Sequence, residues 1–415
     1  MKVFAGVRAA AGPAVVFVVA GGLAGGVAQG APAGHAARAA QAQVIMKPDF
    51  RIKVLGHYRD GKAVIFASKP KGLPPHAIES VYHLTTTNSS GAGQTIAIVD
   101  AFRDPAALSD LNTFSKQYGL PQLATCTSLS QSGACFAQEY PQGTPTVSAD
   151  WVYEQSMDIE AAHAMAPAAK IVLVDTTGAG ATSLYGGVTY ANTLNPDEVS
   201  TSWGGFEGKK EASHDPDFTH PGTLYTASSG DFGGPYVQYP AASPHVLAVG
   251  GTTLAGCSGT SCAGFVLEEA WTGSGGGASK YESLPSYQSS YTGPVYSASA
   301  ISALTGGKRG TPDVSFEADP ETGPSIYDST KYNGQSGWSV GGGTSFGAPS
   351  WAGILAAGAA AGKTALQGDA AIYGGGYKTN LRDITDGTTG TCGTDCTAGT
   401  GYDLTTGLGS PINYP

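Results

Sequence analysis

Charged side chains are scarce in this sequence. Asp, Glu, Lys and Arg make up 13% of its 415 residues, against roughly 25% in typical globular domains. Lys and Arg number 22 and Asp and Glu number 32, so the net charge is −10. No run of five or more basic residues occurs. This charge balance argues against a nucleic-acid partner, because such partners need a basic surface.

Long apolar runs are equally scarce and occur only at the N-terminus. The segment "MKVFAGVR" carries two positive charges, a glycine-diluted apolar stretch follows, and "AQGAPA" supplies small residues for cleavage near Gly30 or Ala33. We interpret residues 1–30 as a secretion signal. The alternative is a membrane anchor, but its apolar part is short and broken by glycine. We therefore expect a secreted protein without membrane contact after signal removal.

Cysteine is limited to six residues, which form three close pairs in the sequence. An even number at short separations in a secreted chain favours local disulfides. Zinc binding is the alternative, but no pair has the C-x₂-C spacing and no histidine lies close by. We expect three disulfides, Cys126–Cys135, Cys257–Cys262 and Cys392–Cys396.

The chain divides into two parts after the signal. Residues 31–88 are mixed in character, with a possible hairpin and one short helix, and we interpret them as an N-terminal extension or short pro-segment. From residue 89 to 415, buried strands such as "TIAIVDA" alternate with helical patterns. This alternation predicts an α/β fold with a doubly wound, mostly parallel sheet and helices on both faces. Such sheets place their sites beyond the carboxyl ends of the strands.

A catalytic histidine is missing where a serine nucleophile would require one. Ser345 stands in "GGGTSFGAP", a glycine-rich turn that opens a helix and resembles the nucleophile segment of subtilisin-like proteases. Its backbone N–H and the helix dipole would favour negative charge, although the serine could simply be a helix cap. None of the eight histidines precedes a glycine, as the subtilisin pattern requires. His163 lies near an acidic helix, and we expect it to be packed rather than catalytic.

Three carboxylates are candidates for the missing base. Glu154 and Asp158 are four residues apart, so both project from one face of a predicted helix. Two acids on a solvated face would be the ordinary explanation, but Asp158 stands among apolar neighbours. Asp231 ends an apolar strand in "SSGDFGG", where parallel sheets place ligands, although aspartates at strand ends often only cap turns.

Taken together, the segments "EQSMDIEAAHAMAP", "SSGDFG" and "GGTSFGAPSWAG" resemble the sedolisin, or serine-carboxyl peptidase, family over residues 89–415. The resemblance implies a subtilisin-like fold in which a glutamate replaces the histidine. It implies that Ser345 is the nucleophile and Glu154 the general base and acid. Asp158 would orient Glu154 and share its proton, and Asp231 would complete the oxyanion hole. Coupled carboxyls of this kind have raised pKa values, so we expect activity at acid pH.

The resemblance also implies one structural calcium ion in the C-terminal loop "RDITDGTTGTCGTDCTAGTGYDL". Asp383 and Asp403 would supply carboxylates, and Ile384, Gly399 and Gly401 backbone carbonyls. Hard oxygen ligands of this kind suit Ca²⁺. The alternative is a surface loop rich in Gly and Asp.

In the same fold, the segment "STSWGG" would pair with an extended substrate by strand addition. Ser202 and Gly204 are the candidate substrate-binding residues. Asp100 occupies the place of the catalytic aspartate of subtilisins, and we interpret it as structural or supporting because there is no histidine for it to orient. The family usually carries a long pro-domain, and residues 31–88 are too short to be one.

We therefore expect a secreted, monomeric serine endopeptidase that acts on proteins or peptides in acid. One alternative is a conventional subtilisin-type protease. Another is a catalytically silent secreted binding protein with the same fold. The sequence does not distinguish endopeptidase from tripeptidyl-peptidase action, and it gives no preference at the cleavage site.

Overall fold

The computed structural model describes residues 44–291, 298–360, 371–376 and 380–413. The predicted signal, residues 1–30, therefore lies outside the described residues. Residues from 43 onward form one compact unit, and eight strands of its described part make the central sheet. The strand order is β13 (Leu267–Ala270), β12 (Leu247–Ala255), β10 (Leu224–Ser228), β8 (Glu198–Thr201), β5 (Thr95–Ala101), β7 (Lys170–Thr176) and β6 (Phe136–Glu139), with β16 (Val314–Glu317) also paired to β12.

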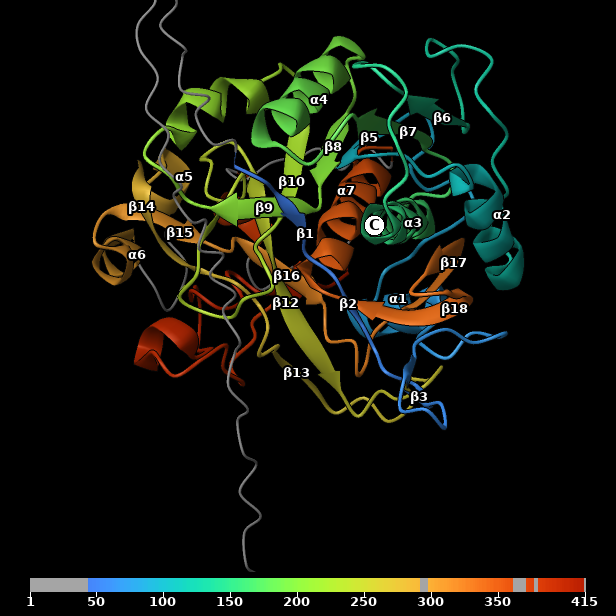
Figure 1. Cartoon of the computed structure of the whole chain (residues 1–415). Helices are drawn as coiled ribbons and strands as arrows, with labels where there is room; N and C mark the ends of the chain where they lie inside the picture. The colour runs from blue at the N-terminus through green and yellow to red at the C-terminus, as the bar shows by residue number, and fades with distance from the viewer. Residues whose placement is uncertain (1–43, 292–297, 361–370, 377–379, 414–415) are drawn as a thin grey trace, which may run out of the picture. The chain divides into compact units, whose positions relative to one another are not determined.

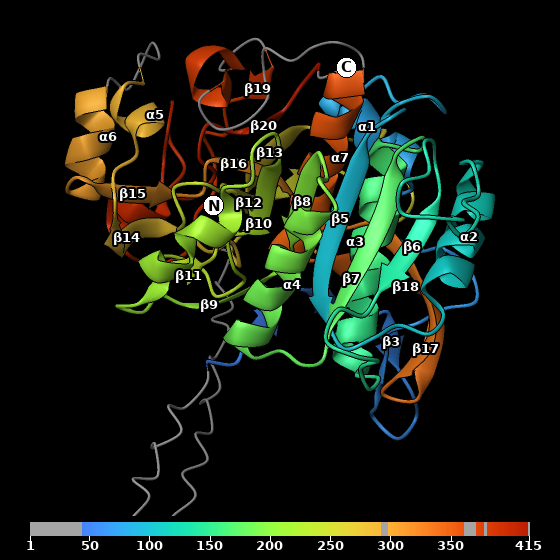
Figure 2. The same cartoon turned by 90° about the horizontal axis from the view of Figure 1, so that it is seen from above.

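All neighbouring strands in this sheet are parallel except β13, which runs antiparallel to β12. Figure 2 shows β8, β5, β7 and β6 side by side. The strands are apolar on both faces, as expected for a parallel sheet covered on both sides. The predicted doubly wound, mostly parallel sheet is confirmed.

Alternating residues of the strands serve the two faces. On β5, Ile96 and Ile98 belong to a core shared with helices α3 (Ala149–Met165) and α7 (Thr344–Ala360). Ala97 and Val99 belong to the opposite core, which contains helix α4 (Ala181–Thr193). Figure 1 shows α4 above the strands and the pair α3 and α7 below them. Helices therefore cover both faces, and the two expected to carry the site lie on the same face.

Smaller elements surround the sheet. Helix α2 (Ala107–Tyr118) ends at Gly119, which has φ +73°, a conformation that favours glycine. Residues of the expected N-terminal extension form β3 (Gly56–His57), β4 (Ala63–Val64) and α1 (Pro75–Tyr82). Their apolar side chains, such as Ile78 and Tyr82, belong to the same core as α7. Other elements include β11 (Gln238–Tyr239), β14 (Gly277–Ser283), β15 (Lys308–Thr311), β17 (Ser325–Tyr332), β19 (Leu381–Arg382), β20 (Ser410–Pro411), α5 (Ser286–Ser289) and α6 (Ala298–Thr305).

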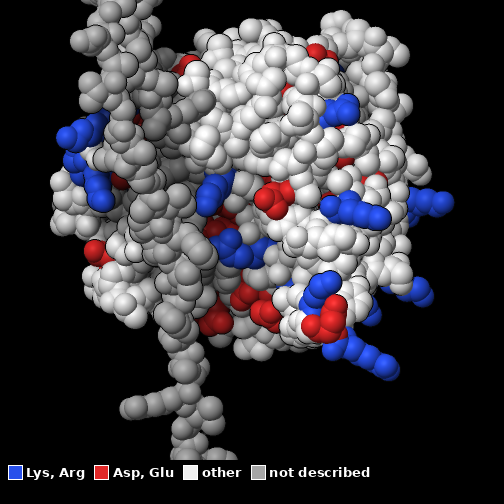
Figure 3. Space-filling view, viewed as in Figure 1, with Lys and Arg blue, Asp and Glu red and all other residues white. Residues whose placement is uncertain are grey.

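The three predicted disulfides are all formed, Cys126–Cys135, Cys257–Cys262 and Cys392–Cys396. No helix in the described part of the chain is long and apolar enough to cross a membrane. On the face drawn in Figure 3, Lys and Arg side chains lie in separate small groups.

Candidate active site

Ser345 lies in the first turn of α7, directly after strand β18 (Gln335–Gly342). Gly343 between them has φ +101°, a conformation that favours glycine. Further along α7, a Cβ at Gly353 would lie 2.6 Å from the Cβ of Met165 on α3. The absence of that Cβ allows the two helices to pack closely. Their close packing brings the first turn of α7 near the carboxylates of α3.

The hydrogen bonds of Ser345 are made with two backbone segments. Its Oγ donates to the Ser202 carbonyl oxygen at 3.2 Å and accepts from the Asp49 N–H at 3.1 Å. Its own N–H donates to the Asp49 carbonyl oxygen at 3.0 Å. Ser345 is fully buried, so the segment around Asp49 covers its hydroxyl. The Ser345 hydroxyl therefore lies directly against the main chain at Asp49.

Glu154 and Asp158 are fully buried on α3. None of their four carboxyl oxygens hydrogen bonds to another described residue. Burial, followed by the charge of Asp158, raises the pKa of Glu154 well above its usual value, and the nearby Ser345 hydroxyl opposes this rise. Burial and the charge of Asp100 likewise raise the pKa of Asp158. The structure thus brings Glu154 to the serine hydroxyl, with Asp158 beside Glu154.

Asp100, at the end of β5, is the third member of this carboxyl group. Its side chain is fully buried, and neither oxygen has a hydrogen-bond partner among the described residues. Burial raises its pKa to about 8. Because a buried carboxylate without a partner is costly, burial favours the protonated forms of this group, and the neighbouring carboxyls share protons rather than all ionising together.

Asp231, on the loop after β10, contacts Thr344, the residue directly before Ser345. Its Oδ1 accepts hydrogen bonds from the Thr344 N–H and Oγ1, both at 2.9 Å. Its Oδ2 is buried and has no hydrogen-bond partner in the described part of the chain. Burial raises the pKa of Asp231 to about 7, although Arg51 lowers it. At lower pH the carboxyl is protonated and can donate a hydrogen bond.

The predicted substrate-binding residues lie along the edge of the site. Gly204, in strand β9 (Trp203–Phe206), is paired with Lys47 of strand β1 (Lys47–Pro48) in an antiparallel ladder. The Ser202 carbonyl accepts the Asp49 N–H at 3.4 Å. Both residues therefore contact an extended segment of the chain itself.

The predicted calcium loop brings its two carboxylates to one turn. Both oxygens of Asp383 accept the Gly401 N–H at 3.0 and 3.1 Å, and Asp403 Oδ2 accepts the Gly399 N–H at 2.8 Å. No hydrogen bond from another described residue reaches the carbonyl oxygens of Ile384, Gly399 or Gly401. Free carbonyls beside two carboxylates fit a hard cation such as Ca²⁺. Among the described residues, no group of three or more acidic, His or Cys side chains is arranged to hold a metal ion, so an ion here would depend on these carbonyls.

Three residues of the site are absent from the sequence-based prediction. Thr344 holds Asp231, whereas Ser228 and Gln238 contact the Asp49 side chain. Of these three, only Thr344 could have been identified from the sequence, because it directly precedes the candidate nucleophile. His163 is buried, with Nε2 2.7 Å from the Pro121 carbonyl oxygen, and burial lowers its pKa to about 4. It is packed, as expected.

Comparisons with known proteins define the class. The model of the subtilase family of peptidases matches residues 143–367, more than half of the chain. Sedolisin from Pseudomonas sp. (strain 101) is 27% identical over 85% of this chain and 62% of its own length. Kumamolisin from Bacillus sp. (strain MN-32) is 30% identical over 89% of this chain and 67% of its own. The chain thus spans slightly less than two thirds of the first relative.

A solved structure supports the same class of protein. Pseudomonas sedolisin, a serine-carboxyl proteinase in complex with pseudo-iodotyrostatin, superposes with a TM-score of 0.67. It is 28% identical and covers 83% of this chain and 96% of its own. The fold is therefore subtilisin-like. Within that class, the chain belongs to the sedolisin family of serine peptidases.

Proposed function

We propose that this protein is a serine-carboxyl peptidase that hydrolyses peptide bonds of proteins or peptides at acid pH. The observation that carries the proposal is the grouping of buried carboxyls near Ser345. Glu154 lies at the Ser345 hydroxyl with Asp158 beside it, and Asp231 accepts two hydrogen bonds from the preceding Thr344. Their carboxyl oxygens include five without a hydrogen-bond partner among the described residues. Unpaired buried polar atoms of this kind indicate a functional site.

In this proposal Ser345 Oγ attacks the substrate carbonyl carbon and passes its proton to Glu154. The oxyanion that forms accepts hydrogen bonds from the Ser345 N–H and from protonated Asp231. Glu154 then gives the proton to the leaving amine, and a water molecule repeats the sequence on the acyl-enzyme. Asp158 holds a proton and donates it in a hydrogen bond to Glu154, which keeps Glu154 ionised and oriented.

The proposed chemistry requires acid. Asp231 donates to the oxyanion only when protonated, and its pKa is about 7. Above that value the site would hold an additional negative charge where the oxyanion develops. In stronger acid Glu154 gains a proton and ceases to be a base, so activity falls again. We therefore expect activity to follow a bell-shaped pH profile with its maximum on the acid side.

We also propose one structural calcium ion in the loop of residues 383–403, held by the two carboxylates and three carbonyls described above. When bound, the ion would supply positive charge that holds the turn of residues 399–401 against β19 and β20. It would take no part in the reaction. Secretion and a monomeric state complete the proposal, and they rest on the N-terminal sequence and the family.

The test is proteolysis of an unfolded protein at pH 4 by the wild type and by Ser345→Ala. Ser350→Ala is a matched control, because Ser350 lies on the same helix and its hydroxyl donates only to the Phe346 carbonyl at 2.7 Å. Loss of cleavage in Ser345→Ala alone supports the proposal. Equal, negligible cleavage by all three proteins supports a catalytically silent binding protein instead.

A further inference from the structure

Residues 44–53 run through the active site as an extended chain. The Met46 N–H donates to the Ala179 carbonyl at 2.8 Å, and the Ala181 N–H donates to the Val44 carbonyl at 2.8 Å. On the other side, β1 pairs with β9. Past the serine, strand β2 (Arg51–Ile52) pairs antiparallel with Gly341 and Gly342 of β18. Figure 1 shows β1 beside β9 and β2 beside β18. The segment is therefore held by main-chain pairing on both sides of Ser345.

The Asp49–Phe50 peptide bond is the one presented to the nucleophile. The Asp49 carbonyl oxygen accepts the Ser345 N–H, and its N–H reaches Ser345 Oγ at 3.1 Å. A Cβ at Gly343 would collide with the Asp49 carbonyl oxygen and would lie 2.6 Å from both Asp231 Oδ2 and Phe50 Cα. These three groups thus converge on one point. The carbonyl oxygen lies where an oxyanion would form, between the Ser345 N–H and Asp231.

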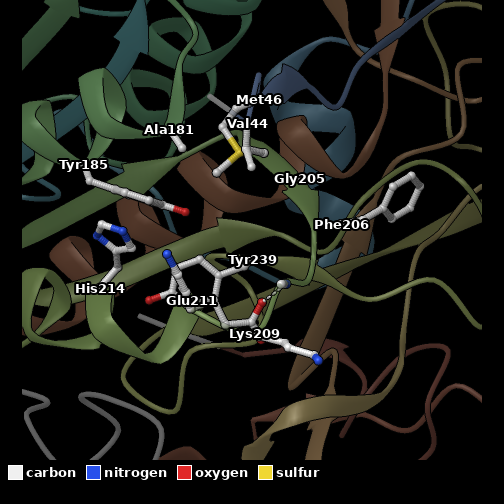
Figure 4. A pocket seen from close by; sticks show the side chains of 12 residues that line it. Val44, Met46, Ala181, Tyr185, Gly205, Phe206, Lys209, Glu211, His214 and Tyr239 are labelled. Atoms are coloured by element: carbon white, nitrogen blue, oxygen red, sulfur yellow. Dashed lines mark hydrogen bonds between the residues drawn. The ribbon is translucent and has the colours of Figure 1, made fainter. Parts of the chain in front are cut away.

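The side chains of the segment also occupy formed sites. Asp49 is 1% exposed, and its Oδ2 accepts the Ser228 hydroxyl at 2.9 Å. Phe50 packs on Tyr153, which precedes Glu154 on α3, with ring centroids 5.0 Å apart. Met46 is buried in an apolar pocket, and Figure 4 shows it beside Val44 and Ala181 with Tyr185 across the pocket. The side chains on both sides of the Asp49–Phe50 bond are therefore held by contacts with the rest of the protein.

We infer that residues 44–53 are the enzyme's first substrate, cleaved in cis by Ser345 at the Asp49–Phe50 bond, and that the Ser228–Gln238 pocket selects the Asp49 side chain. The inference rests on the proposed peptidase function and adds to it a defined bond and a residue preference. It also divides the N-terminal extension. Residues up to 49 would be released, whereas residues 50–88, which pack into the core, would remain.

The reaction is an ordinary hydrolysis. Ser345 Oγ forms an ester with the Asp49 carbonyl carbon, and the bond from that carbon to the Phe50 nitrogen breaks. The serine proton passes through Glu154 to that nitrogen, which becomes the new N-terminal amine. Water then hydrolyses the ester, restores Ser345 and leaves residue 49 with a free α-carboxyl group.

The test is performed on the full chain purified at neutral pH and transferred to pH 4. N-terminal sequencing and intact-mass measurement follow its cleavage over time, and digestion of an unrelated unfolded protein is measured in parallel. We expect a product that begins at Phe50, absent from Ser345→Ala. The fraction cleaved per minute should not change over a 30-fold dilution, because the bond is already bound. The synthetic heptapeptide MKPDFRI should be cleaved between Asp and Phe by the processed enzyme.

Two variants test the pocket. Asp49→Arg introduces a longer, charged side chain into a buried site, and we expect at least a tenfold slower cut after residue 49. Asp60→Arg is its matched control in an exposed turn, and it should be processed at the wild-type rate. Asp49→Asn keeps the shape and the hydrogen bond from Ser228, so its rate should lie within a few-fold of wild type.

The inference and the proposed function fail differently. If the chain digests the unrelated protein but its own N-terminus is uncut, cut at another bond or cut at a rate proportional to concentration, the inference is wrong and the peptidase function stands. Equal rates for Asp49→Arg and wild type overturn the role of the pocket. If neither substrate is cleaved, both the inference and the proposed function are wrong.

Discussion

Replacing Glu154 by Gln changes one atom of the proposed base and removes its ability to accept a proton. The side chain keeps its shape, and its burial on α3 is complete. General acid–base groups contribute about 10²–10⁴-fold to rates, which corresponds to roughly 3 to 5 kcal/mol of activation free energy. We therefore expect Glu154→Gln to lower kcat/KM at pH 4 by that range.

The same substitution should not weaken the fold. Burial raises the pKa of Glu154 above its unfolded value, so its contribution to stability is present in acid and is lost as pH rises through the folded pKa. A glutamine mimics the protonated carboxyl and does not ionise. The free energy of unfolding at pH 7 should therefore increase. The increase is about 1.4 kcal/mol for each unit by which the folded pKa of Glu154 exceeds its unfolded pKa, counted up to pH 7.

The assay measures kcat/KM at pH 4 together with urea unfolding at pH 4 and pH 7. Glu160→Gln is the matched control, because Glu160 is buried on the same helix and accepts only the Tyr327 N–H, at 3.1 and 3.3 Å. It should retain activity. Glu154→Gln with wild-type activity would refute the assignment of the base. Loss of activity in proportion to a loss of folded protein would show that Glu154 is merely structural.

Three further predictions concern other parts of the site. Asp231→Ala should lower kcat at pH 4 by about 10²–10³-fold, the usual cost of one oxyanion donor; an unchanged kcat would exclude Asp231 from the oxyanion hole. The melting temperature, measured by calorimetry, should be highest in acid and should fall between pH 5 and 8. The reason is that the folded pKa values of Asp100 and Asp231, about 8 and about 7, lie above their unfolded values. A melting temperature that rises over that range would contradict this. Chelation of calcium should lower the melting temperature of the wild type but leave the melting temperature of Asp403→Ala unchanged. The matched control is Asp386→Ala, in an exposed position, and chelation should lower its melting temperature as it does for the wild type.

Much of the sheet was predictable because parallel strands are buried on both faces. The apolar segment from residue 95 to 101 was expected as a strand, and β5 has these bounds. Glycine and proline stand at or just beyond the ends of two helices, Gly119 at the end of α2 and Pro167 after α3, as is usual for these residues. The antiparallel pair β17 and β18 escaped prediction, since exposed and buried residues along it do not keep a simple alternation.

The candidate site was predicted from three separate motifs, and the fold brings them together. What the sequence could not indicate was the segment around Asp49. Its place depends on backbone pairing with β9 and β18, which leaves little trace in residue type. Ser228 and Gln238 were missed for a related reason. They belong to the site only because they contact the Asp49 side chain.

In the proposed mechanism, a carboxylate serves Ser345 as its base and a protonated Asp231 completes the oxyanion hole. The decisive experiment measures kcat/KM of the wild type on an unfolded protein from pH 3 to pH 9. We expect a maximum on the acid side of pH 6 and little activity at pH 8, where Asp231 is ionised. A maximum at pH 8 or above would contradict it.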